Sequence, residues 1–182
     1  MLQSPAVRCA AAALMLATTA APAVANAVDN WACATGSRSD APAKDWVALP
    51  GVHAVSGHIR FIEGTSGPGW QPHAAITLRT AVPPGEEDCG CTGLMAFLIP
   101  DPDGGLKVQY EVHGNGGGEP FAQARPAVAI TFRVSVTDDL LSVSIGQTDP
   151  VTKSVKLRYP PTGSLFLTCT SANVVFFDIR TE

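Results

Sequence analysis

Apolar and polar residues alternate with a period of two along most of the chain after residue 50. This period is typical of strands that bury one face and expose the other, because successive side chains of a strand point to opposite sides. The alternation is most regular in four runs, at 55–61, 74–79, 106–113 and 128–137. Shorter runs of the same kind predict further strands at 94–99, 140–146, 153–159, 164–170 and 173–180.

Turn-forming segments separate these runs. They are Asp-Asp, Asp-Pro, Pro-Pro and Asp-Gly-Gly sequences, which stop or turn the chain. No stretch after residue 30 has a sustained apolar period of three to four residues, so no substantial helix is expected. About nine short strands, each with one apolar face, predict an all-β fold in which two antiparallel sheets pack face to face as a β-sandwich.

The amino-terminal residues have a different pattern from the rest of the chain. Arg8 precedes an apolar run over residues 9–21, and small residues follow up to Ala25-Asn26-Ala27. A basic residue, an apolar run and an A-x-A site are typical of a secretory signal peptide. The run is shorter than the roughly 20 residues that a membrane span requires. We therefore expect three parts: a signal peptide at 1–27, an amino-terminal segment packed on the sandwich at 28–50, and a sandwich domain at 51–182.

The charge of the chain narrows the range of partners. The 182 residues have a net charge of −4, and loss of the signal peptide would remove Arg8 and leave −5. A mildly acidic chain without a basic cluster has little to attract phosphate backbones, so nucleic acid is not expected as a partner. No second apolar stretch approaches the length of a membrane span. We expect an exported protein, periplasmic or secreted.

Three segments carry a resemblance to a known fold family: GHIRFIEG at 57–64, ITFRVSVTDDLLSVSIGQ at 130–147 and GSLFLTCTSANVVFFDIRTE at 163–182. The middle segment reads as a long strand, a tight turn at Asp138-Asp139 and a second strand that ends in Gly146. The last reads as a closing hairpin with an aspartate after paired aromatics. In this order the segments resemble the concanavalin A-like jelly roll of lectins, glucanases and many secreted modules. The resemblance implies a two-sheet antiparallel sandwich of jelly-roll type and a carbohydrate or glycan as ligand.

The catalytic residues of that family do not carry over. Retaining glycosidases need two closely spaced carboxylates, one to attack the sugar and one to protonate the leaving oxygen. The best-placed strand, at 108–113, offers only Glu111 on its polar face. We therefore favour a binding module over an enzyme. The alternatives are a glycoside hydrolase with an unrecognised carboxylate pair, a thiol-disulfide catalyst at Cys89 and Cys91, and a structural envelope protein without a small ligand.

Polar side chains on the strong strands give a first set of candidate ligand-binding residues. Arg79, Glu111, His113 and Arg133 could bind hydroxyls or carboxylates if their strands are neighbours in one sheet. The alternative is that they form an ordinary solvent face of the sandwich. Trp70 lies in a predicted loop, where it could stack on a sugar ring or cap the core. Two other tryptophans are expected to pack the amino-terminal segment onto the sandwich, Trp31 and Trp46.

Four cysteines remain after the expected signal cleavage: Cys33, Cys89, Cys91 and Cys169. An even number in an exported chain favours disulfides, and four cysteines allow three pairings. Spacing leaves all three open, including a strained bond between Cys89 and Cys91. The jelly-roll resemblance implies that Cys33 and Cys169 can meet, because first and last strands often lie together in that fold.

The sequence Glu86-Glu87-Asp88-Cys89-Gly90-Cys91 permits two further readings. A zinc site would need two ligands besides the thiolates, from the neighbouring acids or His73, but the one-residue spacer is shorter than that of usual zinc pairs. A redox site is disfavoured, because nearby negative charge raises the pKa of a thiol. We therefore expect structural disulfides, no metal and no cofactor.

Overall fold

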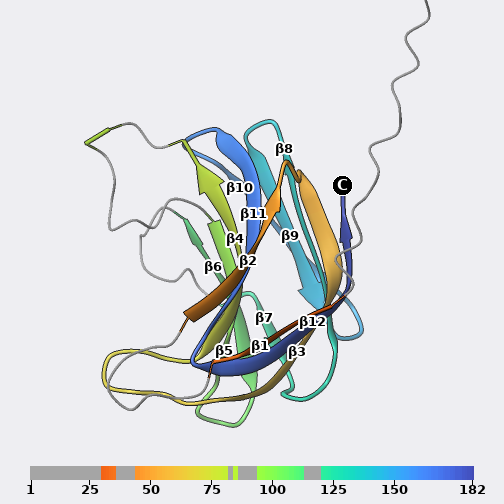
Figure 1. The fold of residues 1–182 in the computed structure, drawn as a ribbon. Helices are drawn as coiled ribbons and strands as arrows, with labels where there is room; N and C mark the ends of the chain where they lie inside the picture. Colours follow the sequence, from red (N-terminus) through yellow and green to blue (C-terminus); the bar gives the residue numbers. More distant parts are fainter. Residues whose placement is uncertain (1–29, 36–43, 82–83, 86–93, 113–119) are drawn as a thin grey trace, which may run out of the picture.

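A computed structural model describes residues 30–35, 44–81, 84–85, 94–112 and 120–182, which form two packed sheets (Figure 1). The described residues contain no helix, and so none that is long and apolar enough to cross a membrane. The strands are β1 (Asn30–Ala34), β2 (Lys44–Pro50), β3 (Ala54–Gly64), β4 (His73–Thr80), β5 (Leu94–Pro100), β6 (Leu106–Val112), β7 (Ala122–Ala124), β8 (Ile130–Thr137), β9 (Leu140–Gly146), β10 (Val151–Lys156), β11 (Pro161–Thr170) and β12 (Ala172–Thr181).

Each sheet has six strands, and every pairing is antiparallel. Sheet A has the order β1-β12-β3-β8-β9-β10, and sheet B has the order β2-β11-β4-β5-β6-β7. The two sheets face each other, with buried apolar side chains between them. The predicted fold class, an all-β two-sheet antiparallel sandwich of jelly-roll type, is confirmed.

All nine predicted strands are present, with small differences at their ends. β8 begins at Ile130 and not at residue 128, because Ala127 lies in a turn with a left-handed φ of 60°. β10 ends at Lys156 and not at residue 159, because its partner β9 begins opposite it at Leu140. The regular alternation therefore predicted the positions of the strands well and their end residues less well.

Three strands were not predicted: β1, β2 and β7. β1 and β2 come from the amino-terminal segment at 28–50, and each forms one edge of a sheet. β7 has three residues and pairs only with β6. β1 and β7 have five and three residues, so a period of two has little length in which to show. β2 has seven residues, but its exposed positions include the apolar Trp46 and Ala48, so apolar and polar residues do not alternate along it.

The core is built from every second residue of the central strands. Inward-pointing aromatics meet in its middle, where the rings of Phe132 and Phe176 lie edge to face with centroids 6.2 Å apart. Trp31 of β1 stacks on Phe176 at 5.4 Å, so the prediction that this tryptophan packs the amino-terminal segment onto the sandwich is confirmed. The largest fully buried side chains are Phe61, Phe132, Phe176, Ile59, Ile76, Leu78, Leu106, Ile130, Leu141 and Ile145.

A β-bulge interrupts β12 opposite β3. The register shifts between Phe177 and Arg180, and Asp178 within the bulge has a left-handed φ of 52°. Gly57 of β3 lies against this bulge: a Cβ there would stand 3.0 Å from the carbonyl oxygen of Phe177 and 3.2 Å from that of Asp178. Both are main-chain atoms, so the position requires a residue without a side chain.

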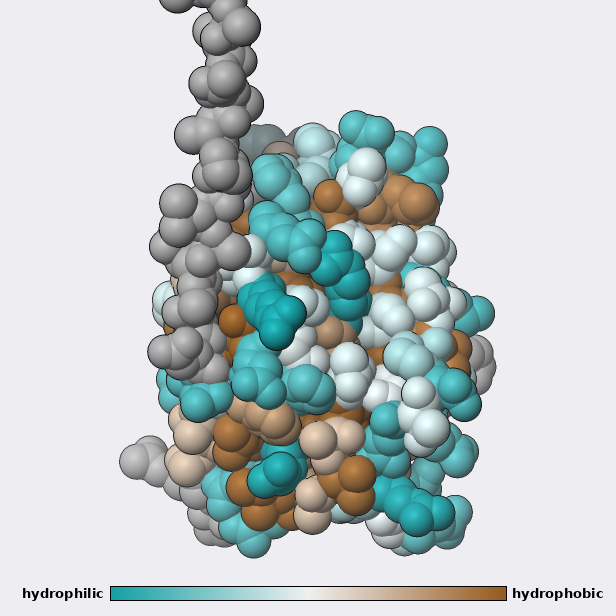
Figure 2. Space-filling model, turned by 90° about the vertical axis from the view of Figure 1, so that its right-hand side faces the viewer, coloured by the Kyte–Doolittle hydropathy of each residue, from teal (hydrophilic) through white to brown (hydrophobic). Residues whose placement is uncertain are grey.

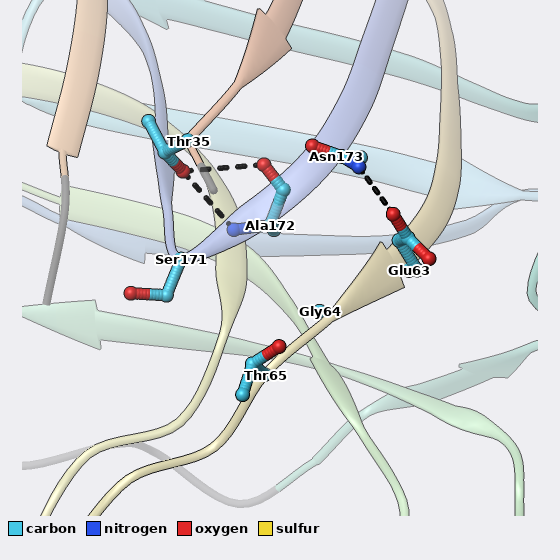
Figure 3. Close-up of a pocket in the computed structure, with 7 residues that line it drawn as sticks. All are labelled: Thr35, Glu63, Gly64, Thr65, Ser171, Ala172 and Asn173. Carbon is cyan, nitrogen blue, oxygen red and sulfur yellow. Dashed lines mark hydrogen bonds between the residues drawn. The ribbon is translucent and has the colours of Figure 1, made fainter. Parts of the chain in front are cut away.

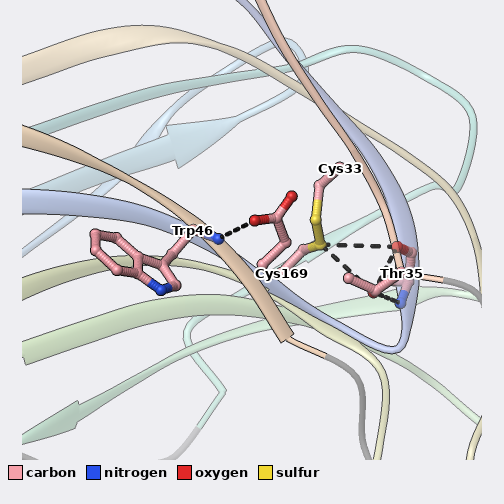
Figure 4. Close-up of a disulfide and its surroundings, with 6 residues drawn as sticks. Cys33, Thr35, Trp46 and Cys169 are labelled. Atoms are coloured by element: carbon pink, nitrogen blue, oxygen red, sulfur yellow. Dashed lines mark hydrogen bonds between the residues drawn. A yellow bond between two sulfur atoms is a disulfide. The ribbon is translucent and has the colours of Figure 1, made fainter.

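A disulfide joins the two sheets across the core (Figure 4). Cys33 lies on β1 of sheet A and Cys169 on β11 of sheet B, with Cα atoms 6.3 Å apart. Both are buried, at 2% and 0% exposure. Of the three pairings that the sequence left open, this bond is compatible only with the one that leaves Cys89 and Cys91 to each other, and those two cysteines lie outside the described residues.

Candidate functional site

The structure places the predicted ligand-binding residues on two different sheets. Arg79 on β4 and Glu111 on β6 belong to sheet B, with β5 between their strands. Arg133 on β8 belongs to sheet A. His113 lies outside the described residues. The condition for a shared polar surface, that these strands be neighbours in one sheet, is therefore not met for Arg133.

Arg133 is already engaged with a carboxylate. Its guanidinium donates two hydrogen bonds to Glu182, at 2.7 Å to Oε1 and 2.9 Å to Oε2. These bonds raise the pKa of Arg133 and lower the pKa of Glu182, and the opposite charges act in the same direction. Because its guanidinium already donates two hydrogen bonds to Glu182, Arg133 has fewer donors left for a ligand than Arg79 has.

The polar face around Arg133 consists mainly of hydroxyl side chains that bond to one another. Ser142 lies 2.9 Å from Ser154, and Thr152 donates to Ser144 at 3.1 Å. Figure 2 shows this face of the molecule, with strongly hydrophilic side chains near its middle and side chains of intermediate hydropathy beside them. These hydroxyl groups on the outer face of sheet A bond to one another within the sheet, as expected for an ordinary solvent face.

Trp70 packs on its own turn. It forms an isolated bridge with Gly67, and Gly69 between them has a left-handed φ of 79°. A Cβ added to Gly67 would lie 2.3 Å from the indole ring, so the ring covers this glycine closely. Trp70 is half-buried in this arrangement. Its local role is to close the tight turn between β3 and β4.

The outer face of sheet B carries an aromatic cluster that the sequence did not single out. Trp46 on β2 is 59% exposed, the most exposed of the large apolar side chains described. Its ring meets that of Phe166 on β11 edge to face, with centroids 5.7 Å apart. The guanidinium of Arg79 on β4 lies 4.5 Å from the centre of the Phe166 ring. We call these three residues the aromatic platform.

Strand pairing produces this cluster. β11 lies between β2 and β4, and Phe166 is opposite Ala48 on one side and Thr77 on the other. The small Ala48 leaves space beside Phe166 for the indole of Trp46. Because Leu165 and Leu167 point into the core, Phe166 between them must point outward. Its low exposure of 9% thus comes from Trp46 and Arg79 covering it, and not from the core.

The disulfide lies close to the start of β2, the strand that carries Trp46 of the platform. Cys169 is opposite Asp45, the residue before Trp46, and Asp45 Oδ1 accepts a hydrogen bond of 2.8 Å from the Trp46 amide (Figure 4). The edge strand that carries Trp46 is therefore fixed at its start by pairing with a strand that is itself covalently tied to sheet A. A side chain on such a strand keeps its position without a ligand.

The platform combines two kinds of contact. The indole offers a flat apolar face, and the guanidinium offers several N–H donors in a fixed plane. Neither aromatic ring of the platform carries a group that acts as a general acid, base or nucleophile. Among the residues that the structure describes, no three His, Cys, Asp or Glu side chains are grouped to hold a metal ion. The arrangement is suited to binding.

Comparison with known proteins adds information on the fold. No protein-family model matches the sequence, and no curated protein matches it. Solved structures do. One is the alginate lyase from Klebsiella pneumoniae, with a TM-score of 0.51 and 12% identity over 71% of this chain and 59% of the lyase. Another is scytalido-glutamic peptidase with a transition state analog inhibitor, with a TM-score of 0.53 and 15% identity over 75% of this chain and 77% of the peptidase.

The likeness is one of fold. At 12% and 15% identity, neither structure assigns an activity to this chain. A carbohydrate-binding module from Bacillus subtilis is also similar, with a TM-score of 0.47 and 13% identity over 80% of this chain and 84% of the module. The alginate lyase is a jelly-roll sandwich, so this comparison agrees with the resemblance inferred from the sequence at the level of architecture.

Proposed function

We propose that this protein is an exported carbohydrate-binding module and that it binds a glycan on the aromatic platform of sheet B. The observation that carries the proposal is the exposure of Trp46: 59% of a tryptophan faces solvent on a sheet surface, beside a guanidinium held over an aromatic ring. Tryptophan is enriched at interfaces, because its ring is apolar while its indole N–H can donate a hydrogen bond.

The chemistry of the platform fits a sugar ring. A pyranose has an apolar C–H face, which can lie on the indole of Trp46, and hydroxyls at its rim, which can accept hydrogen bonds from Arg79. Thr168 of β11 is directly opposite Trp46 and adds a hydroxyl to the same surface. Glu111 is a further candidate on β6, two strands away from the strand of Arg79 in the same sheet.

Two further observations support the proposal. An alginate lyase shares the fold, so another protein that acts on a carbohydrate uses this sandwich, although fold alone transfers no activity. A buried disulfide between the sheets is compatible with the oxidising compartment that the expected signal peptide at 1–27 would lead to.

The test is glycan binding by wild-type protein and by single variants. An array of neutral and acidic glycans selects a ligand, and calorimetry then measures its affinity. We expect Trp46→Ala to weaken binding about tenfold or more, since an aromatic contact contributes roughly 1 to 1.5 kcal/mol beyond its buried area. Arg79→Ala should weaken it by a similar factor, because charged hydrogen bonds are lost.

Two control variants separate the platform from other sites. Trp70→Phe changes a tryptophan that packs on its own turn, and Arg133→Gln changes an arginine on the opposite sheet. Both should retain the wild-type affinity. The proposal is refuted if folded wild-type protein binds no glycan, or if Trp46→Ala binds the selected glycan as tightly as the wild type does.

A further inference from the structure

A polar hollow lies at the end of the sandwich where the chain passes from sheet B to sheet A (Figure 3). Its volume is about 300 Å³, at the lower end of the range for small-molecule sites. One wall is the turn at Ser171 between β11 and β12, together with Asn173. A second side is the end of β3, which pairs with β12, with Glu63 and then Thr65. Thr35, after β1, closes a third side.

The walls of this hollow are held from several directions. The disulfide fixes Cys169, two residues before Ser171. The Thr35 hydroxyl donates to the carbonyl of Ala172 at 3.2 Å and accepts from its amide at 3.1 Å (Figure 3). The turn at Ser171 and the end of β3 are joined by a main-chain hydrogen bond, in which the Thr65 amide donates to the carbonyl of Ser171 at 3.0 Å. A site that is formed before its ligand arrives loses little entropy on binding.

The hollow offers mainly hydrogen-bond acceptors. Asn173 Nδ2 donates to Glu63 Oε1, and the two side chains point toward one another in Figure 3. This bond uses one carboxylate oxygen and leaves Oε2 of Glu63, while the Asn173 carbonyl also remains an acceptor. Thr65 adds a hydroxyl. The described lining contains one carboxylate and no lysine, arginine or histidine.

We infer that this hollow binds one residue of an amino sugar, a compact ring whose hydroxyls and protonated amine are all donors. The amine would lie against Glu63, and ring hydroxyls would donate to Asn173 and exchange hydrogen bonds with Thr65. The hollow, with a volume of about 300 Å³, is large enough to admit a single monosaccharide. The inference does not rest on the aromatic platform, because the two sites share no residue.

The experiment is an amide NMR titration of the ¹⁵N-labelled protein with glucosamine, and separately with glucose. We expect glucosamine to shift the amide signals of Gly64, Thr65, Ser171 and Ala172, with an affinity about tenfold higher than that of glucose, since only glucosamine can pair with the carboxylate. Equal affinity for the two sugars, shifts elsewhere in the chain, or no shift with either sugar would overturn the inference.

Variants complete the test. Glu63→Gln keeps the size of the side chain and removes its charge, so it should abolish the preference for glucosamine. Glu182→Gln removes a carboxylate that lies elsewhere, beside Arg133, and should keep the preference. Trp46→Ala should also keep the preference for glucosamine. A loss of binding at the hollow can therefore be told apart from a loss of binding at the aromatic platform. A Glu63→Gln protein that still prefers glucosamine tenfold would rule the site out.

Discussion

The disulfide between Cys33 and Cys169 makes a strong prediction about stability. The two cysteines are 136 residues apart in sequence, so the bond closes a loop that contains nearly all of sheet B and four of the six strands of sheet A, β3, β8, β9 and β10. Replacing both with alanine opens that loop in the unfolded state and leaves the strand pairing in place. The background for all variants should carry Cys89→Ser and Cys91→Ser, so that no other thiol can exchange with the pair.

The expected magnitude follows from the length of the loop. The chain-entropy relation gives about 5 kcal/mol of stabilisation for a loop of this size, and native disulfides in small secreted domains contribute about 2 to 5 kcal/mol. Loss of the buried sulfur atoms adds to the cost, because both side chains are almost fully enclosed. Since domains of this size have unfolding free energies of about 5 to 15 kcal/mol, the variant should be marginally stable.

Urea unfolding followed by tryptophan fluorescence measures this difference. With a slope of about 2 kcal/mol per molar urea, the unfolding midpoint should fall by at least 1 M and as much as 2.5 M. The wild-type protein unfolded in the presence of a reductant should behave like the variant. A change in unfolding free energy below about 1 kcal/mol, with an unchanged slope, would show that the closed loop does not stabilise this sandwich.

The remaining predictions concern the bulge and the ion pair. Gly57→Ala should lower the melting temperature by about 3–10 °C, because the new methyl group would meet the carbonyl of Phe177 at 3.0 Å, and such overpacking costs about 1 to 3 kcal/mol. Gly105→Ala, whose methyl group would have no neighbour nearer than 3.6 Å, is the control and should change the melting temperature little. Because Arg133 lowers the pKa of Glu182, the ion pair stabilises the fold above the ordinary pKa of a glutamate, and this contribution is lost as the pH falls through the lowered value. Arg133→Leu should therefore raise the NMR titration midpoint of the Glu182 carboxyl, and an unchanged midpoint would contradict the role assigned to this pair.

The local alternation of apolar and polar residues was sufficient to predict the two-sheet sandwich. The regular alternation in β3, β4 and β8 comes directly from burial of one face, so these strands could be located from sequence alone. The edge strands β1 and β2 could not, because β1 is short, the exposed positions of β2 are partly apolar, and each is held by pairing with a strand more than one hundred residues away. Pairing with a strand far away in the sequence produces no pattern in the local sequence.

The candidate sites depended on information that no local pattern contains. The sequence placed Arg79 and Arg133 on polar faces, but which sheet each joined was decided by long-range strand order. Trp46 was expected to pack the amino-terminal segment onto the sandwich, yet its phase on β2 turns it outward beside Phe166. An outward aromatic between two inward leucines, as in Leu165-Phe166-Leu167, was the one available signal.

The positions of the last two strands also determine when this protein can fold. Among the described strands, β1 pairs with β12 alone and β2 pairs with β11 alone. β11 also separates β2 from β4, and β12 separates β1 from β3. Until residues 161–181 have been synthesised, the first two strands have nothing to pair with and both sheets are incomplete. These distant segments must therefore meet before the sandwich closes, and such long-range pairing makes folding slow.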